Sequence, residues 1–566
     1  MNANVTPLVI GVTSHRNIPA HEIDPIRIRV RELLAQLRRE FPHSPLTVIS
    51  ALAEGGDQLV AQEALAVGAQ LIAPLPLPRD VYTQDFIDAA TRDAFAALCE
   101  RAHVFELPLL PGHTDADVAR AGVERDRQYA RAGVFIARHC HLLLAIWDGK
   151  ESERLGGTAQ VVEYYLHGVM PGLIERRRGA RRWLFGYGDE RPVCHLVCSR
   201  DAADGAPQVP LQSGQIIWRT AGSVSAPDVP MPARFHSAFA CAGKFNLDAT
   251  KYRARIDAAP VDTVERDAPP SLAPLFRAAD WLALHFQKRV LLAMRMSYIV
   301  AGLMGIAFTV YDNLSNADAF IYVFLLLFAS GAAISTLAQR REWHRKYLDY
   351  RALAEGLRVQ GYWRRGGISL TGDPEFAQDS LQQKQNIELD WVRDAMRSAD
   401  LVRVPDAPEG RTIRLQRVIA EWIGDTASGQ LGYYTRKAVQ RERNYHITEL
   451  IGKISLYAGV GISVALAVLA FRLSADAKNN LIVLMAIFSV SGAVREAYAY
   501  RKADKELIKQ YRFMRRLFAD AHAALLGARD DAEQREILRA LGEAALSEHA
   551  EWAMMHRQRP LEHGRM

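Results

Sequence analysis

The sequence predicts an α/β domain with a parallel sheet, followed by an all-α membrane region. Two observations carry this prediction. Short apolar runs alternate with helical patterns over the first 200 residues, and four long apolar runs follow later in the chain. The chain has 566 residues, which is enough for several domains. With 49% hydrophobic and 24% charged residues it has the composition of a folded protein, which excludes a disordered or collagen-like chain.

Six short apolar runs predict strands in the N-terminal part, at residues 8–12, 46–50, 70–75, 103–107, 141–146 and 195–198. Helical patterns lie between them, over 26–41, 58–67 and 159–167. The strands are apolar throughout rather than alternating. Such strands are typical of a parallel sheet that is covered by helices on both faces.

Small and polar residues gather where these strands end and where the following helices begin. Ligands of open parallel sheets bind beyond the carboxyl ends of the strands. The candidate ligand-binding residues are therefore Gly11, Thr13, Ser14, His15, Arg16, Ser50, Glu54, Gly55, Gly56, Asp57, Trp147, Asp148, Gly149, Gly156, Gly157 and Thr158.

These residue types suit a nucleotide. Glycines at a helix start expose backbone N–H groups to a phosphate, Arg16 can add a bidentate contact, and Asp57 or Asp148 can hold ribose hydroxyls. Each feature also has a purely structural explanation. The glycines fit tight turns, and Asp57 fits a helix N-cap.

The four long apolar runs predict transmembrane helices at about 292–312, 319–338, 453–472 and 480–495. The alternative is a set of buried helices in a soluble core. Two short polar links join the runs into pairs, and the opposite ends of the runs are rich in Lys and Arg. By the positive-inside rule both termini are cytoplasmic, so we expect a multi-pass protein of the inner (plasma) membrane.

The two pairs of runs resemble each other at an offset of 161 residues. Ser330–Ala332 matches Ser491–Ala493, Tyr350–Arg351 matches Tyr511–Arg512, and Trp391 matches Trp552. This predicts a tandem duplication of a helical hairpin whose second helix continues into the cytoplasm, as over 342–360. Small residues at Ala301/Gly305 and Gly459/Ser463 have the spacing that permits close helix packing.

The expected domains are residues 1–200, a connecting segment at 201–270, a first hairpin module at 271–400 and a second at 401–566. Residues 201–229 are rich in Ala, Pro, Gly and Ser, which is typical of a loop or crossover. The five cysteines form no disulfide framework, and Cys194 and Cys198 lack a second ligand pair at zinc spacing. We expect no metal and no required cofactor.

The charge balance does not predict a nucleic-acid partner. The chain carries 70 basic and 64 acidic residues, a net charge of +6, and its mean hydropathy is −0.09. Much of the basic surplus brackets the apolar runs, where it determines topology. The lipid bilayer and a small molecule are the expected partners.

Three motifs, in order, resemble one known group of domains: GVTSHR after the first strand, SALAEGGDQLVAQEALAVGAQLIAPLPLP after the second, and LLLAIWDG followed by GGT. They resemble the SLOG superfamily, a Rossmann-like group related to the LOG cytokinin-activating hydrolases. The segment YRALAEGLRVQ after the first pair of runs, and Glu551–Trp552 near the C-terminus, resemble the SLATT two-helix membrane modules. The N-terminal domain of TRPM channels is a more distant parallel.

The resemblance implies a sensor of a nucleotide-derived or ADP-ribose-like ligand, joined to a pore-forming effector of bacterial defence that acts as a homo-oligomer. The alternative is a membrane-tethered LOG-type nucleotide N-glycosidase. LOG enzymes carry a PGGxGT loop followed by a catalytic glutamate. Here the loop is Arg154–Thr158 without the proline and the intervening glycine, and Glu163 comes late. This departure favours binding without catalysis.

Overall fold

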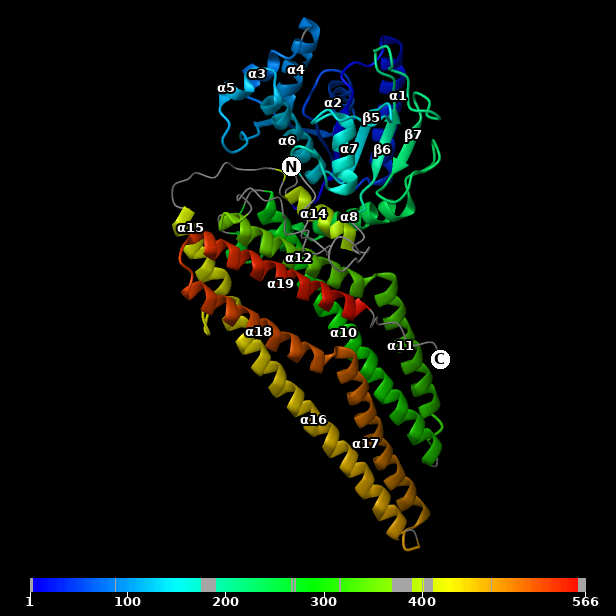
Figure 1. Ribbon diagram of the computed structural model, residues 1–566. Helices are drawn as coiled ribbons and strands as arrows, with labels where there is room; N and C mark the ends of the chain where they lie inside the picture. Colours follow the sequence, from blue (N-terminus) through cyan, green and yellow to red (C-terminus); the bar gives the residue numbers. More distant parts are fainter. Residues whose placement is uncertain are drawn as a thin grey trace. The chain divides into compact units, whose positions relative to one another are not determined.

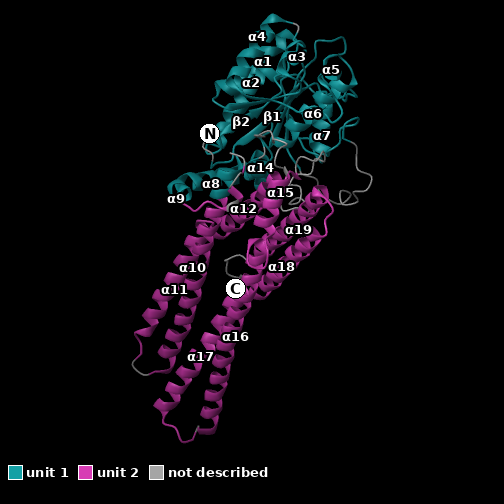
Figure 2. Cartoon of the chain, turned by 90° about the vertical axis from the view of Figure 1, so that its left-hand side faces the viewer, with its two compact units in different colours: residues 1–258, 269–278, 378–404 teal, residues 259–268, 279–377, 405–566 magenta. Residues whose placement is uncertain are grey.

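The structure is a computed structural model that describes residues 4–86, 88–174, 190–265, 268, 271–314, 317–368, 389–399, 401, 411–469 and 471–557. The chain divides into two compact units, shown in teal and magenta in Figure 2. The first unit comprises residues 1–258, 269–278 and 378–404, and the second comprises 259–268, 279–377 and 405–566. This grouping differs from the expected domains, because most of 201–270 and the end of 271–400 belong with the sheet.

A seven-stranded sheet forms the centre of the first unit, in the order β4-β3-β2-β1-β5-β6-β7 (Figure 1). The strands are β1 Leu8–Ser14, β2 Leu46–Ile49, β3 Gln70–Leu75, β4 His103–Glu106, β5 Leu142–Trp147, β6 Val193–Val197 and β7 Ile216–Arg219. All neighbouring strands are parallel except β6 and β7. The predicted Rossmann-like parallel sheet is confirmed. Strand β7 was not predicted, since it lies in the segment expected to be a loop.

Helices cover both faces of this sheet. Helices α1 (Ala20–Glu40), α2 (Gly56–Ala66) and α4 (Ala89–Arg101) lie on one face, while α6 (Val123–His139) and α7 (Thr158–His167) lie on the other. In β1, Ile10 and Val12 belong to the core of the first face and Val9 to that of the second. Successive side chains of a strand point to opposite faces, so a strand covered on both faces must be apolar throughout. Short helices α3 (Arg79–Thr83) and α5 (Asp115–Val118) follow β3 and β4.

Three further helices complete the first unit: α8 (Ala233–Lys251), α9 (Arg253–Asp257) and α14 (Asp390–Ala399). Helix α14 packs on α8, where the rings of Phe245 and Trp391 lie 5.7 Å apart. The Arg234 guanidinium donates to the Asp390 carboxylate at 3.0 Å. Trp391, the expected counterpart of Trp552, therefore packs in the first unit.

The described elements of the second unit are all helical. They are a short turn at Thr263–Glu265, α10 (Leu272–Asn313, whose first residues are grouped with the first unit), α11 (Phe320–Arg340), α12 (Trp343–Arg365), α15 (Arg411–Val418), a π-helical turn at Ile419–Ile423, α16 (Gly429–Leu469), α17 (Ala475–Lys502), α18 (Asp504–Leu526) and α19 (Asp531–Arg557). Four helical stretches are long and apolar enough to cross a membrane: Leu272–Asn313, Phe320–Arg365, Gly429–Leu469 and Ala475–Leu526. They cover most of each of the four predicted spans, in two hairpins (Figure 1), although the third helix ends at Leu469, before the predicted end at 472.

Large apolar side chains are exposed along the apolar stretches of these helices. In α10, Leu292 and Ile299 are 60% and 53% exposed, whereas Met294 and Val300 in the same stretch are 6% and 7% exposed. In α11, Leu326 is 69% exposed. Soluble proteins rarely expose large contiguous apolar surfaces, so these faces fit contact with lipid.

The two hairpins share one backbone irregularity at the predicted offset. Glu342 directly precedes α12, after α11 ends at Arg340, and Ala503, 161 residues later, separates α17 from α18. Both residues have a left-handed backbone, with φ of 50° and 53°. Helices α12 and α18 are each 23 residues long. A left-handed conformation costs about 1–2 kcal/mol in a residue other than glycine, so its recurrence in one register supports the duplication.

Small residues lie at the predicted helix contacts of the hairpins. A Cβ at Gly305 of α10 would lie 3.1 Å from Cγ1 of Val490 in α17. A Cβ at Gly459 of α16 would lie 3.6 Å from Oγ of Ser489. The Tyr298 hydroxyl donates to the Ala497 carbonyl at 3.2 Å. The two hairpins are therefore in contact through α10 of the first and α17 of the second.

Candidate ligand-binding site

The candidate site lies at the carboxyl ends of β1 and β5, where the chain reverses its direction across the sheet. From β1 the chain proceeds outward through β2, β3 and β4, and it then returns to β5 on the other side of β1. Strand β1 pairs in parallel with both β2 and β5. Such a reversal is the point at which parallel α/β sheets bind ligands.

A buried carboxylate links the ends of β1 and α2. The Ser14 hydroxyl donates to Oδ1 of Asp57 at 2.5 Å, and Asp57 is 5% exposed. Burial raises the pKa of Asp57 to about 6, although Ser14, Arg16 and Ser50 act in the opposite direction. The carboxyl group therefore changes charge slightly below neutral pH.

A second buried carboxylate, that of Asp148, lies directly after the end of β5. Oδ2 of Asp148 lies 2.7 Å from Nε of Arg200, and Oδ1 accepts the Lys150 backbone N–H at 3.1 Å. Nε2 of His15 accepts the Asp148 backbone N–H at 3.2 Å. Burial lowers the pKa of His15, although the Asp148 carboxylate raises it, so the imidazole is neutral at pH 7. The predicted residues His15 and Asp148 are thus in direct contact.

Two of the predicted glycines are required by close backbone contacts. Gly55 has φ of 87°, and a Cβ there would lie 2.1 Å from the Arg16 carbonyl oxygen. Gly156 has φ of 75°, and its Cβ would lie 2.8 Å from the backbone nitrogen of Ala130. Both conformations favour glycine. The loop that contains Gly55 therefore packs closely against the chain after β1, and the loop that contains Gly156 packs closely against α6.

The other predicted glycines also have structural explanations. Gly11 lies inside β1, where a Cβ would meet Sγ of Cys140 at 2.7 Å, so it is a packing position under α6 rather than an edge residue. A Cβ at Gly56 would lie 2.6 Å from the Ser14 Cβ, and one at Gly149 would lie 2.6 Å from Leu211. Gly157 is the N-cap residue of α7.

The remaining predicted residues differ in exposure. Thr13 and Thr158 are nearly buried, at 9% and 7% exposed. Ser50 accepts the backbone N–H of Leu52 at 3.1 Å, and Glu54 lies half-buried in the same loop. Trp147 is 6% exposed and its indole donates to the Lys150 carbonyl at 3.0 Å. The indole ring is therefore part of the core.

Arg16 is the exposed cation of the site. Among the residues that the structure describes, its side chain has no hydrogen-bond or ion-pair partner, and its guanidinium lies 5.4 Å from the centre of the Tyr129 ring. The Tyr129 hydroxyl donates to Asp85, which also pairs with Arg125 at 2.7 Å. This arrangement leaves the charge of Arg16 available to an anion while the Tyr129 ring lies beside the guanidinium.

Sequence reasoning missed two of these partners, Arg200 and Tyr129. Arg200 follows β6 directly, so the rule that selected the other strand-end residues would have found it. Tyr129 lies within α6, and no local pattern distinguishes it from a core aromatic residue. Within the described ranges, no group of three or more His, Cys, Asp or Glu residues is arranged to hold a metal ion.

In comparisons with known proteins, no family model matches this chain, and no curated protein is significantly similar to it.

Proposed function

We propose that the protein is a ligand-gated membrane effector. In this proposal, a nucleotide-derived or ADP-ribose-like molecule binds at the carboxyl ends of β1 and β5, and binding changes the state of the membrane helices. The observation that carries the proposal is the presence, in one chain, of a polar sheet edge at the chain reversal and four helices able to cross a membrane.

The chemistry of the sheet edge supports an anionic ligand. Helices α2 and α7 both begin here, and the first N–H groups of a helix have no partner within it. Arg16 supplies an exposed positive charge beside them. Asp57 and Asp148 supply carboxylates of the kind that bind ribose hydroxyls in dinucleotide sites. The resemblance to SLOG sensors points to the same class of ligand.

The helical unit supplies the effector in this proposal. The links between the spans face outwards, both termini lie in the cytoplasm, and the membrane is the bacterial inner membrane. The SLATT-like hairpins form a pore or disrupt the bilayer as a homo-oligomer in bacterial defence. A ligand can shift this equilibrium only by its difference in affinity for the two states.

No contact favours the N-glycosidase alternative. Glu163, the nearest acid after the Gly156–Gly157 loop, is 57% exposed on α7, and its nearest ion-pair partner is His167 at 3.9 Å. An enzyme of that kind requires its carboxylate at the ligand.

The test is dye or ion release from liposomes that contain the full-length protein, with AMP, NAD⁺ and ADP-ribose added separately. The wild type should release its contents with at least one of these ligands, and Arg16→Ala should lose that response. The matched control is Arg39→Ala, which removes an exposed arginine at the C-terminal end of α1.

Equal ligand-dependent release from wild type and Arg16→Ala would contradict the binding site. Release that none of the ligands alters would contradict the gating. Chromatography of the same samples detects free base, and rapid base release that Glu163→Gln abolishes would establish the enzyme instead.

A further inference from the structure

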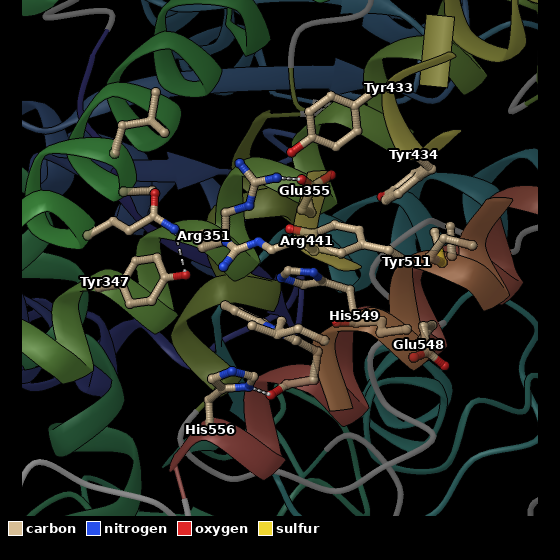
Figure 3. A pocket seen from close by; sticks show the side chains of 18 of the residues that line it. Tyr347, Arg351, Glu355, Tyr433, Tyr434, Arg441, Tyr511, Glu548, His549 and His556 are labelled. Atoms are coloured by element: carbon tan, nitrogen blue, oxygen red, sulfur yellow. Dashed lines mark hydrogen bonds and ion pairs between the residues drawn. The ribbon is translucent and has the colours of Figure 1, made fainter. Parts of the chain in front are cut away.

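The second unit contains a cavity of about 410 Å³ that lies between the two hairpin repeats. Its walls come from α10 and α12 of the first repeat and from α16, α18 and α19 of the second, with the ends of α17 and the π-helical turn. Figure 3 shows side chains of these helices converging on one space. A volume of this size is within the range of small-molecule sites in proteins.

The cavity lining is strongly basic. Six basic side chains and two acidic ones line it: Arg295, Arg351, Arg358, Arg441, Arg501 and Lys502, with Glu355 and Glu548. Isolated buried charges are costly, so a cavity with this excess of cations is suited to an anion.

Part of the positive charge is already partnered. Glu355 pairs with Arg351 and accepts from Nη1 of Arg358 at 2.8 Å, and Asp280 lies 3.4 Å from both guanidinium groups. Burial alone raises the pKa of Glu355, but the two arginines lower it to about 2, so the carboxylate stays ionised. This cluster holds two guanidinium groups rigidly at one wall.

Three of the other cations have less compensation. Arg441 and Lys502 share a single carboxylate, Asp504, at 3.6 and 3.0 Å. Within the described part of the chain, the Arg295 side chain has no hydrogen bond or ion pair. Arginine and lysine donors brought together from three helices suit the oxygens of a phosphate group.

The cavity lining also includes aromatic rings and two buried histidine nitrogens without a hydrogen-bond partner, Nε2 of His549 and Nδ1 of His344. Tyr347, Tyr433, Tyr434 and Tyr511 lie around it in Figure 3, and Trp552 stacks on His549 with ring centres 5.1 Å apart. Nε2 of His549 is buried and has no hydrogen-bond partner in the structure. Burial lowers the pKa of His549 to about 4, so the imidazole is neutral at pH 7. Buried polar atoms are normally satisfied, and a bound ligand would satisfy this one.

We propose that this cavity is a second binding site, distinct from the sheet edge, for a phosphate-bearing small molecule. The phosphate contacts Arg441 and its neighbouring cations, and the rest of the ligand packs against the tyrosines and Trp552. Two sources fit this chemistry, a soluble phosphate ester and a phospholipid headgroup. Because the ligand touches helices of both repeats, its binding couples the positions of the two hairpins.

The experiment uses the full-length protein in nanodiscs, with bound ligand counted by native mass spectrometry and thermal unfolding measured in parallel. One arm adds AMP or inorganic phosphate to phosphatidylcholine nanodiscs, and the other includes phosphatidylglycerol in the bilayer. Stabilisation by AMP or phosphate identifies a soluble ligand, and stabilisation by phosphatidylglycerol alone identifies a lipid.

Two variants act on the cavity by different routes. Arg441→Gln removes a cation and should weaken binding about tenfold, as expected for one charged hydrogen bond. Ala545→Phe fills the space at a lining position and should abolish binding. The matched controls are Arg443→Gln and Ala540→Phe, which change exposed positions on the same two helices. Both controls should bind as the wild type does.

Arg16→Ala separates the two sites, because it should leave cavity binding unchanged even where the response at the sheet edge is lost. The proposal is overturned if neither arm stabilises the wild type, or if Arg441→Gln and Ala545→Phe bind as their controls do. Loss of cavity binding in Arg16→Ala would also overturn it, since the sites would then not be distinct.

Discussion

The buried carboxyl group of Asp57 makes a sharp prediction about pH. Burial raises its pKa to about 6, from 3.8 in an exposed chain. At low pH the group is protonated in both the folded and the unfolded state and has no effect on stability. As the pH rises from about 4 to 6, the unfolded chain ionises first, so the folded state loses stability. The shift of about 2.2 pKa units corresponds to about 3 kcal/mol.

Asp57→Asn removes this titration and keeps an oxygen that can accept the Ser14 hydroxyl. At pH 4 the variant and the wild type should have the same unfolding temperature. At pH 8 it should be more stable by up to about 3 kcal/mol, which raises the unfolding temperature of a unit this size by about 6–12 °C. The assay is thermal unfolding of the full-length protein in detergent at several pH values.

The control is Asp93→Asn, which changes an exposed carboxylate on α4 and should leave the pH profile unaltered. Parallel profiles for wild type and Asp57→Asn between pH 4 and 8 would refute the reasoning. So would a variant that is less stable than the wild type at pH 8, because the ionised carboxylate would then stabilise the fold.

Three other predictions concern the helices of the second unit and the topology of the chain. Ala503→Gly should raise the free energy of unfolding by about 1 kcal/mol, because glycine adopts the left-handed conformation without strain; thermal unfolding measures this. Gly542→Ala should destabilise the protein by about 1–3 kcal/mol, because the added Cβ would lie 2.4 Å from the indole nitrogen of Trp363. The control is Gly461→Ala, where no other atom lies within 4 Å of the added Cβ. Asp312→Cys should react in intact cells with a membrane-impermeant maleimide, whereas Ala202→Cys should react only after lysis, as cell labelling will test.

Each of these predictions has an opposing result. A lower unfolding temperature for Ala503→Gly would show that the left-handed residue is not strained. Equal stability of the two glycine variants would show that α12 and α19 are not in close contact at Gly542. Labelling of Ala202→Cys in intact cells would reverse the proposed topology.

The sheet was predictable because its signal is local. The central strands of the parallel part are apolar runs bounded by turn residues, and a run buried on both faces stands out without knowledge of its neighbours, whereas the residues of the edge strand β4 are exposed or half-buried. Strand β7 is different. It has only four residues, Ile216–Arg219, within a segment rich in turn residues, and it pairs antiparallel with β6. Only the edge of an already formed sheet makes it a strand.

The sheet-edge site and the cavity of the second unit also differ in how far the sequence predicts them. The contacts of Ser14 with Asp57 and of His15 with Asp148 join strand ends to the start of a helix or to another strand end, and the sheet topology brings these together by rule. No such rule predicts the lining of the cavity, because its residues lie between Ala283 and His556 in the sequence and meet only through the packing of the helices. The spans were predictable from apolar length, whereas the packing of their cytoplasmic continuations was not.

The duplicated hairpin has a further consequence for how its surfaces evolve. In a symmetric homodimer every substitution appears twice, so both halves of a shared site must change together. Here the two copies lie in one chain and mutate independently. Arg351 lines the cavity, whereas Arg512, its counterpart 161 residues later, pairs with Glu442 on the exposed surface. The two equivalent positions therefore have different surroundings, and a substitution in one wall of the cavity leaves the matching position of the other hairpin unchanged.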